Sequence, residues 1–219
     1  MPTTLLKTIQ SPSPRVQHLT KLAAYAACAA PLLWTLYQVY GALNGQNDLG
    51  ANPIERIIRR LGEVTLYLLV FTLAVTPVRT VLKAPWLLKL RRLLGVSAFA
   101  YASLHLLAYA AWDQAFSLQD MVADTAKRPF IFVGMAAWLL MLPLAATSFN
   151  AAIRWLGGKR WQVLHQAVYA VAVAGTLHFW WIKSSKSDFA RPALFALLFA
   201  ALLGWRLWRW VAAKRRKAA

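Results

Sequence analysis

The sequence predicts an all-α integral membrane protein, a bundle of six transmembrane helices with both termini in the cytoplasm. Three observations lead to this prediction. Hydrophobic residues make up 59% of the 219 residues, only 15% are charged, and the hydrophobic residues lie in long blocks. A soluble domain carries about 25% charged residues, and its apolar residues form periodic stripes. The sequence therefore excludes an ordinary water-soluble globule.

The apolar blocks have the length of membrane spans. A helix that crosses the hydrocarbon core needs about 20 mostly apolar residues. We expect a cytoplasmic tail over 1–21, one membrane domain over 22–211 and a basic cytoplasmic tail over 212–219. The connections are too short for a separate catalytic domain, which needs at least about 50 residues. The six predicted spans are 22–41, 64–82, 93–112, 129–149, 161–182 and 191–211.

The single cysteine, Cys28, lies in the first block. One thiol permits no internal disulfide, no iron–sulfur cluster held by cysteines and no CxxCH haem attachment. The block around it is too long for the short apolar region of a cleaved signal peptide. We therefore interpret this block as a retained transmembrane helix.

The basic residues predict the orientation of the bundle. The chain carries 25 Lys and Arg against 7 Asp and Glu, a formal net charge of +18. With the six blocks as spans, 17 basic residues and no acidic residue lie on the side of the termini. The positive-inside rule places that side in the cytoplasm, so the charge requires no nucleic-acid partner. These residues are Lys7, Arg15, Lys21, Arg79, Lys83, Lys89, Arg91, Arg92, Arg154, Lys159, Arg160, Arg206, Arg209, Lys214, Arg215, Arg216 and Lys217.

The acidic residues all lie on the opposite side. Among them, Asp113, Asp120 and Asp124 fall in one connection. We interpret that connection as a polar loop, with docking of a partner as the alternative.

Three of the four histidines lie inside predicted spans, where ionisable side chains are costly and usually functional. The spans that carry His105 and His178 both run outward, and each histidine lies roughly 20 Å above the cytoplasmic end of its span. His105 and His178 therefore share a level in the outer half of the bundle. His165 lies near the cytoplasmic surface instead.

Two neutral imidazoles that face each other across a bundle can supply both axial ligands of a haem iron. We therefore predict His105 and His178 as iron ligands, with interhelical hydrogen bonding as the alternative. His165 has no histidine partner at its level, where Arg91 and Arg92 lie. Four roles stay open for His165: an iron ligand opposite a weaker partner, a contact to a haem propionate, or part of a flavin site or of a quinone site.

The stretches around these histidines resemble the MsrQ (YedZ) family, the haem-binding membrane subunits of the MsrPQ methionine sulfoxide reductase system. More broadly, the chain is similar to the ferric reductase-like transmembrane domain shared with NADPH oxidases. Those relatives carry two histidines on each of two helices, whereas span 93–112 keeps only His105, which implies one firmly ligated outer haem. The matching stretches are Arg91-Arg92-Leu93-Leu94-Gly95, Ser103-Leu104-His105, Gly158-Lys159-Arg160-Trp161-Gln162-Val163-Leu164-His165 and Leu177-His178-Phe179-Trp180, with Asn52-Pro53, Leu61-Gly62 and Thr76-Pro77.

The resemblance implies a non-catalytic electron-transfer subunit in a bacterial inner membrane. It would pass electrons from the quinone pool through haem b to a periplasmic molybdenum-containing subunit, MsrP, which reduces methionine sulfoxide in oxidised envelope proteins. The resemblance also implies FMN, whose phosphate would meet Arg91, Arg92, Lys159 and Arg160, although we find no flavin-binding motif. A solvated positive-inside rim is the preferred interpretation of those four charges.

Two other functions stay open from the sequence. One is a ferric, other metal or flavin-linked transmembrane reductase with a different acceptor. The other is a non-redox membrane protein, such as a small transporter.

Overall fold

The computed structural model describes residues 10–46, 48–184 and 187–218, with side chains to residue 216, and contains helices and no strand within those ranges. Residues 1–9 of the predicted N-terminal tail, including Lys7, and the Lys217 side chain lie outside the described part. The long helices are α2 (Pro14–Leu43), α3 (Pro53–Val81), α4 (Leu88–Ala108), α6 (Pro129–Ala146), α9 (Ala167–Ser184) and α10 (Ala190–Ala218). Shorter elements are η1 (Pro85–Leu87), the π-helical turn η2 (Tyr109–Asp113), α5 (Leu118–Lys127), α7 (Asn150–Leu156) and α8 (Gly158–His165).

Helices α2 and α3 begin earlier than their apolar blocks because capping residues extend them. Ser13 accepts a hydrogen bond from the backbone N–H of Val16, and Pro14 follows it as the first residue of α2. Asn52 accepts a hydrogen bond from the backbone N–H of Glu55, and Pro53 follows it as the first residue of α3. A polar cap followed by proline satisfies the first free N–H groups and sets the helical φ angle. The blocks at 22 and 64 therefore mark where the apolar stretch begins, not where the helix begins.

Five helices of the described chain are long and apolar enough to cross a membrane. They correspond to five of the six predicted spans. The remaining predicted span, 161–182, is interrupted at Gln166 and divided between α8 and α9. The sixth crossing and the cytoplasmic location of the termini stay predictions. Two short helices, α5 and α7, were not predicted, and α5 replaces the polar loop expected around Asp120. The five helices are Pro14–Leu43, Pro53–Val81, Pro85–Asp113, Pro129–Ala146 and Ala190–Arg216.

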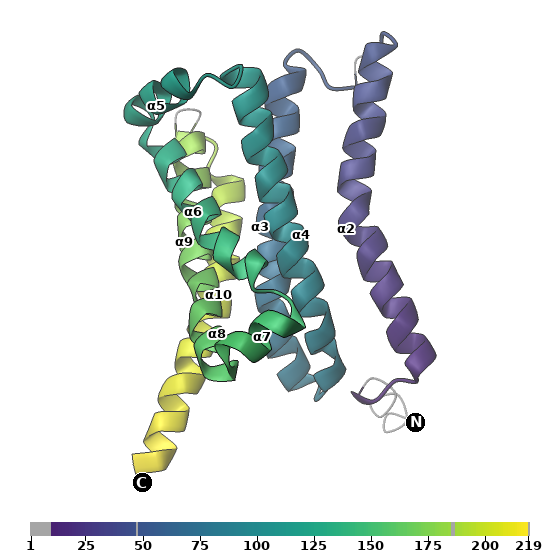
Figure 1. Cartoon of the computed structure of the whole chain (residues 1–219), viewed down its shortest axis with the longest axis vertical. Helices are drawn as coiled ribbons and strands as arrows, with labels where there is room; N and C mark the ends of the chain where they lie inside the picture. Colours follow the sequence, from purple (N-terminus) through teal and green to yellow (C-terminus); the bar gives the residue numbers. More distant parts are fainter. Residues whose placement is uncertain (1–9, 47, 185–186, 219) are drawn as a thin grey trace.

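The helices pack side by side in a bundle, with α5 across one end and α7 and α8 at the other (Figure 1). Helix α3 packs along α4, and α9 lies between α6 and α10. Leu73, Val171 and Phe195 are fully buried where α3, α9 and α10 meet. Large apolar side chains on the outside of the bundle, such as Trp155 and Leu197, are exposed. A chain that is apolar both inside and outside is expected to be surrounded by lipid.

Helix α2 lies to one side of the bundle (Figure 1), and Tyr101 of α4 forms two hydrogen bonds with its backbone. The Tyr101 hydroxyl donates to the carbonyl of Cys28 at 2.7 Å and accepts from the N–H of Leu32 at 3.0 Å. Those two backbone groups are four residues apart and would otherwise bond to each other in a regular helix. Pro31 precedes Leu32, so the tyrosine inserts into the backbone ladder of α2 beside a proline, where helices commonly bend.

Candidate cofactor site

A cavity of about 1070 Å³ lies between α3, α4, α6 and α9. Its wall along the helices is mostly apolar and includes Leu66, Met141 and Val171. Charged side chains, among them Arg59 and Arg128, line the cavity toward the end of the bundle where α5 lies. We call this end the mouth of the cavity. A mostly apolar cavity with a few polar groups is the usual form of a cofactor site.

His105 and His178 both line this cavity. They come from α4 and α9, and their ring centroids are 6.2 Å apart with the ring planes at 82°. The expectation that they share a level is therefore confirmed. Their role as iron ligands stays a prediction. Among the residues that the structure describes, no three His, Cys, Asp or Glu side chains converge as in a site for a free metal ion.

Each of the two imidazoles is held by a backbone carbonyl on the helix beside it. His105 Nδ1 lies 2.8 Å from the carbonyl oxygen of Ile58, and His178 Nδ1 lies 2.6 Å from that of Phe130. A carbonyl oxygen only accepts, so both Nδ1 atoms carry the proton and donate. In a neutral imidazole this leaves the lone pair on Nε2. Metal-binding histidines are oriented in the same way, through the ring nitrogen that does not bind the metal.

Two glycines provide the space that these rings occupy. A Cβ at Gly62 would lie 3.1 Å from His105 Cε1, and a Cβ at Gly134 would lie 2.7 Å from His178 Cε1. In both cases the carbonyl that accepts from the histidine lies four residues before the glycine, at Ile58 or Phe130. Each imidazole therefore lies in a notch formed by one glycine and the carbonyl one turn earlier.

These glycines were not predicted as site residues. Gly62 was named only as part of the Leu61-Gly62 stretch that resembles the family, and Gly134 was not among the sequence features used for prediction. The available signal was a glycine within a long apolar helix, which costs about 1 kcal/mol relative to alanine and so points to a packing or functional reason. The sequence does not show which side chain would occupy the space.

His165 lies apart from the other two histidines and does not line the cavity. Its ring stacks on Trp161 with centroids 3.9 Å apart, and its Nε2 lies 3.1 Å from the Thr147 hydroxyl. Trp161 Nε1 also donates to the Thr147 carbonyl. These contacts join α8 to the end of α6, so His165 belongs to the opposite end of the bundle.

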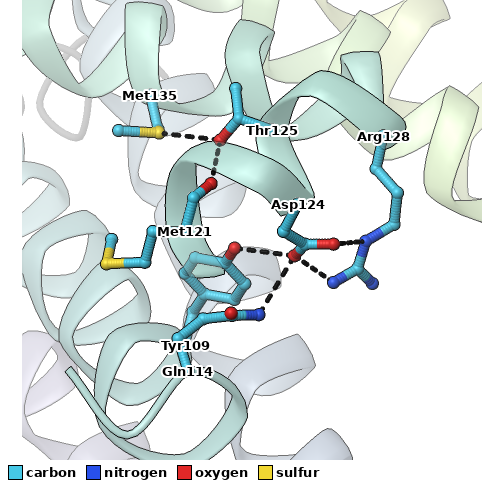
Figure 2. A network of polar contacts seen from close by, with 7 residues as sticks. All are labelled: Tyr109, Gln114, Met121, Asp124, Thr125, Arg128 and Met135. Atoms are coloured by element: carbon cyan, nitrogen blue, oxygen red, sulfur yellow. Dashed lines mark hydrogen bonds and ion pairs between the residues drawn. The ribbon is translucent and has the colours of Figure 1, made fainter. Parts of the chain in front are cut away.

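The mouth of the cavity carries a network of polar side chains around Asp124 (Figure 2). Its carboxylate accepts hydrogen bonds from Tyr109, Gln114 and Arg128. The Arg128 guanidinium holds the pKa of Asp124 below its usual value, because a paired carboxylate favours its charged form. On the other side of the mouth, the buried Lys183 is paired with Asp188 and lowers the pKa of that carboxyl group in the same way.

Residues 61–176 match the family model described as "Ferric reductase like transmembrane component". The chain is also 45% identical over 193 residues to the "Protein-methionine-sulfoxide reductase heme-binding subunit MsrQ" of Polaromonas naphthalenivorans, covering 88% of this chain and 86% of that protein. The chain belongs to the MsrQ family. Two further MsrQ proteins are those of Herminiimonas arsenicoxydans, 49% identical with 75% and 76% of the two chains covered, and of Rhodospirillum rubrum, 45% identical with 91% of each covered.

Membership of the MsrQ family confirms the resemblance seen around the histidine motifs. The segment that matches the ferric reductase model contains His105 and His165 and ends two residues before His178. Together with the five apolar helices, membership identifies a multi-pass membrane protein. The cavity that His105 and His178 line is therefore the candidate cofactor site.

Proposed function

We propose that this chain is the haem-binding electron-transfer subunit of a methionine sulfoxide reductase system, with His105 and His178 as the axial ligands of one haem b. The observation that carries the proposal is the pair of imidazoles with ring centroids 6.2 Å apart in a mostly apolar cavity, each held through Nδ1. The relatives are named heme-binding subunits of a protein-methionine-sulfoxide reductase.

The residues present fit a haem group. An imidazole nitrogen binds a metal ion at about 2 Å, so two rings on opposite sides of one iron have centres roughly 6 Å apart. The two rings here are 6.2 Å apart. The notches at Gly62 and Gly134 fit imidazoles that must stay at fixed positions. Within the described ranges, no acidic or sulfur side chain joins these two imidazoles to make a set of three ligands, and two nitrogen ligands suit an iron whose other positions are filled by a macrocycle.

When bound, haem b supplies one-electron transfer, and the surrounding residues set how readily it occurs. The Nδ1–H bonds to Ile58 and Phe130 fix the orientation of both imidazoles and increase their donor strength. The apolar wall keeps water and competing ligands away from the ring pair. Leu66, Met141 and Val171 contribute to that wall.

The charge distribution supports the membrane orientation that we propose. The side of the termini carries 17 of the 25 basic residues and no acidic one, which favours a bacterial inner membrane with six crossings and both termini in the cytoplasm. The mouth of the cavity then faces the periplasm. There the acceptor would be a molybdenum-containing subunit of the MsrP type, and the quinone pool would be the donor.

FMN is a further cofactor in this proposal, at the opposite end of the bundle. Arg91, Arg92, Lys159 and Arg160 supply positive charge for its phosphate. Arg92 donates to Asn150 Oδ1 at 2.8 Å, so this arginine links α4 to α7. His165 lies at the same end and is proposed to contribute to this inner site.

The deciding experiment is the absorbance and electron paramagnetic resonance (EPR) spectrum of the purified full chain from haem-replete cells. We expect a low-spin haem signal that His105→Ala and His178→Ala each abolish. His18→Ala is the matched control, because His18 is exposed near the start of α2 and should leave the signal unchanged. A colourless unsubstituted protein, or a full bis-histidine spectrum in His105→Ala, would contradict the proposal. Transfer of electrons from a reduced quinol to the MsrP subunit tests the donor and the acceptor.

A further inference from the structure

At the mouth of the cavity, Asp124 joins the stretch that holds Tyr109 and Gln114 to the junction of α5 and α6 (Figure 2). Its carboxylate accepts from Tyr109 Oη at 2.7 Å, from Gln114 Nε2 at 3.1 Å and from Arg128 Nε at 2.5 Å. A second guanidinium nitrogen of Arg128 bonds to the same carboxylate. A bidentate arginine–carboxylate pair fixes geometry as well as contributing energy. Asp124 therefore holds its three partners in one arrangement.

The Tyr109 contact leads to the helix that carries His105. Tyr109 lies one turn after His105, and both side chains line the cavity. Helix α4 changes at Tyr109 into the π-helical turn η2. Such turns are rare and occur frequently at functional sites. The hydrogen bond to Asp124 thus restrains the outer end of α4 at the point where its helical geometry changes.

The Arg128 contact leads to the carbonyl that holds His178. Arg128 is the residue between α5 and α6 and caps both helices, and its N–H donates to the Asp124 carbonyl at 2.8 Å. Two residues later, the Phe130 carbonyl accepts from His178 Nδ1. The Arg128 guanidinium lies 5.8 Å from the centre of the Phe130 ring, which lies 6.1 Å from the His178 ring. Arg128 is therefore linked, through the backbone and through the Phe130 ring, to the acceptor of His178.

We propose that Asp124 is a positioning residue that fixes the mutual orientation of His105 and His178. It acts on the His105 side through Tyr109 and on the His178 side through Arg128 and Phe130. This inference rests on the proposed haem-binding function, in which the two ring planes at 82° are the planes of the iron ligands. The Phe130 bond increases the donor strength of His178 and so stabilises ferric iron. Loosening it should raise the midpoint potential.

The test is Asp124→Asn in the full haem-loaded chain, measured by EPR and by redox titration. Asparagine keeps the size of the side chain and loses the charge that binds the guanidinium. We expect a displaced low-field EPR signal, because that signal depends on the angle between the two ligand planes, and an upward shift of the midpoint potential. Asp120→Asn is the matched control: it removes the same charge one turn earlier on α5, from an exposed residue, and should leave the EPR spectrum unchanged.

Tyr109→Phe is a second variant that keeps every charge and removes one contact of Asp124. It should displace the EPR signal while haem stays bound, and it decides the question if Asp124→Asn fails to fold. Unchanged spectra and potentials in both variants would overturn the inference, as would equal effects of Asp120→Asn and Asp124→Asn. Those outcomes leave the proposed function intact, because haem is still bound and is still lost in His105→Ala. An unsubstituted chain without haem would overturn both.

Discussion

Gly134 is the position where a single added methyl group tests the site most directly. A Cβ there would lie 2.7 Å from Cε1 and 2.8 Å from Nδ1 of His178. Carbon atoms in contact are about 3.5–4.0 Å apart, so Gly134→Ala requires a displacement of roughly 0.8 Å. The His178 ring cannot move that far and keep its 2.6 Å hydrogen bond to Phe130.

The cost of this displacement can be set against the gain in helix propensity. Overpacking a core costs about 1–3 kcal/mol, whereas replacing glycine by alanine inside a helix returns about 0.5–1 kcal/mol. We expect the free energy of unfolding to fall by up to about 2.5 kcal/mol. Strain of about 1–3 kcal/mol on an iron ligand weakens haem affinity roughly 5- to 150-fold.

The assay is haem retention and affinity of the purified variants, with thermal unfolding measured in parallel. Gly62→Ala should have a smaller effect than Gly134→Ala, because its Cβ would lie 3.1 Å from His105 Cε1. Gly204→Ala is the control: no atom lies within 4 Å of its added Cβ, so haem stays bound and stability is unchanged or slightly higher. Full haem affinity in Gly134→Ala, or a larger loss in Gly62→Ala, would refute the reasoning.

Three further predictions concern other parts of the molecule. Tyr101→Phe removes the two hydrogen bonds that join α4 to the backbone of α2, each worth about 0.5–1.5 kcal/mol, so the free energy of unfolding should fall by about 1–3 kcal/mol. Thermal unfolding measures this, and Tyr40→Phe, at an exposed tyrosine, should have no effect. The pKa of Asp124 is lower in the folded protein than its unfolded value of 3.8, so its charge contributes fully to stability above pH 3.8, and this contribution is lost as the pH falls through the folded pKa. Unfolding measured at a series of pH values should show this loss of stability, and Asp124→Asn should abolish this pH dependence. His165→Ala should keep the EPR signal of the haem held in the cavity, because His165 does not line it; loss of that signal would contradict the placement of His165.

The spans illustrate how far hydropathy alone reaches. Apolar blocks predict five helices that the structure contains, since each crossing must satisfy its backbone within itself. The helix starts and the interruption at Gln166 were not predicted. Caps at Ser13 and Asn52 extend helices through polar residues, and the division between α8 and α9 takes His165 out of the helix that carries His178.

The sequence by itself determined the membrane class and the level that His105 and His178 share, and it predicted the sides of the charges, because these follow from hydropathy, helical rise and charge. Only the tertiary structure decided how the pair is held. The carbonyls that accept from these histidines lie 47 and 48 positions away in the chain, and the notches at Gly62 and Gly134 exist only when neighbouring helices pack. The proposed role of Asp124 depends instead on contacts over 4 to 15 positions, which bring the end of α4 and the start of α6 to one carboxylate. The sequence pattern shows that a histidine lies inside a span, whereas contacts between helices distant in sequence decide which of its nitrogens is held and how the ring is oriented.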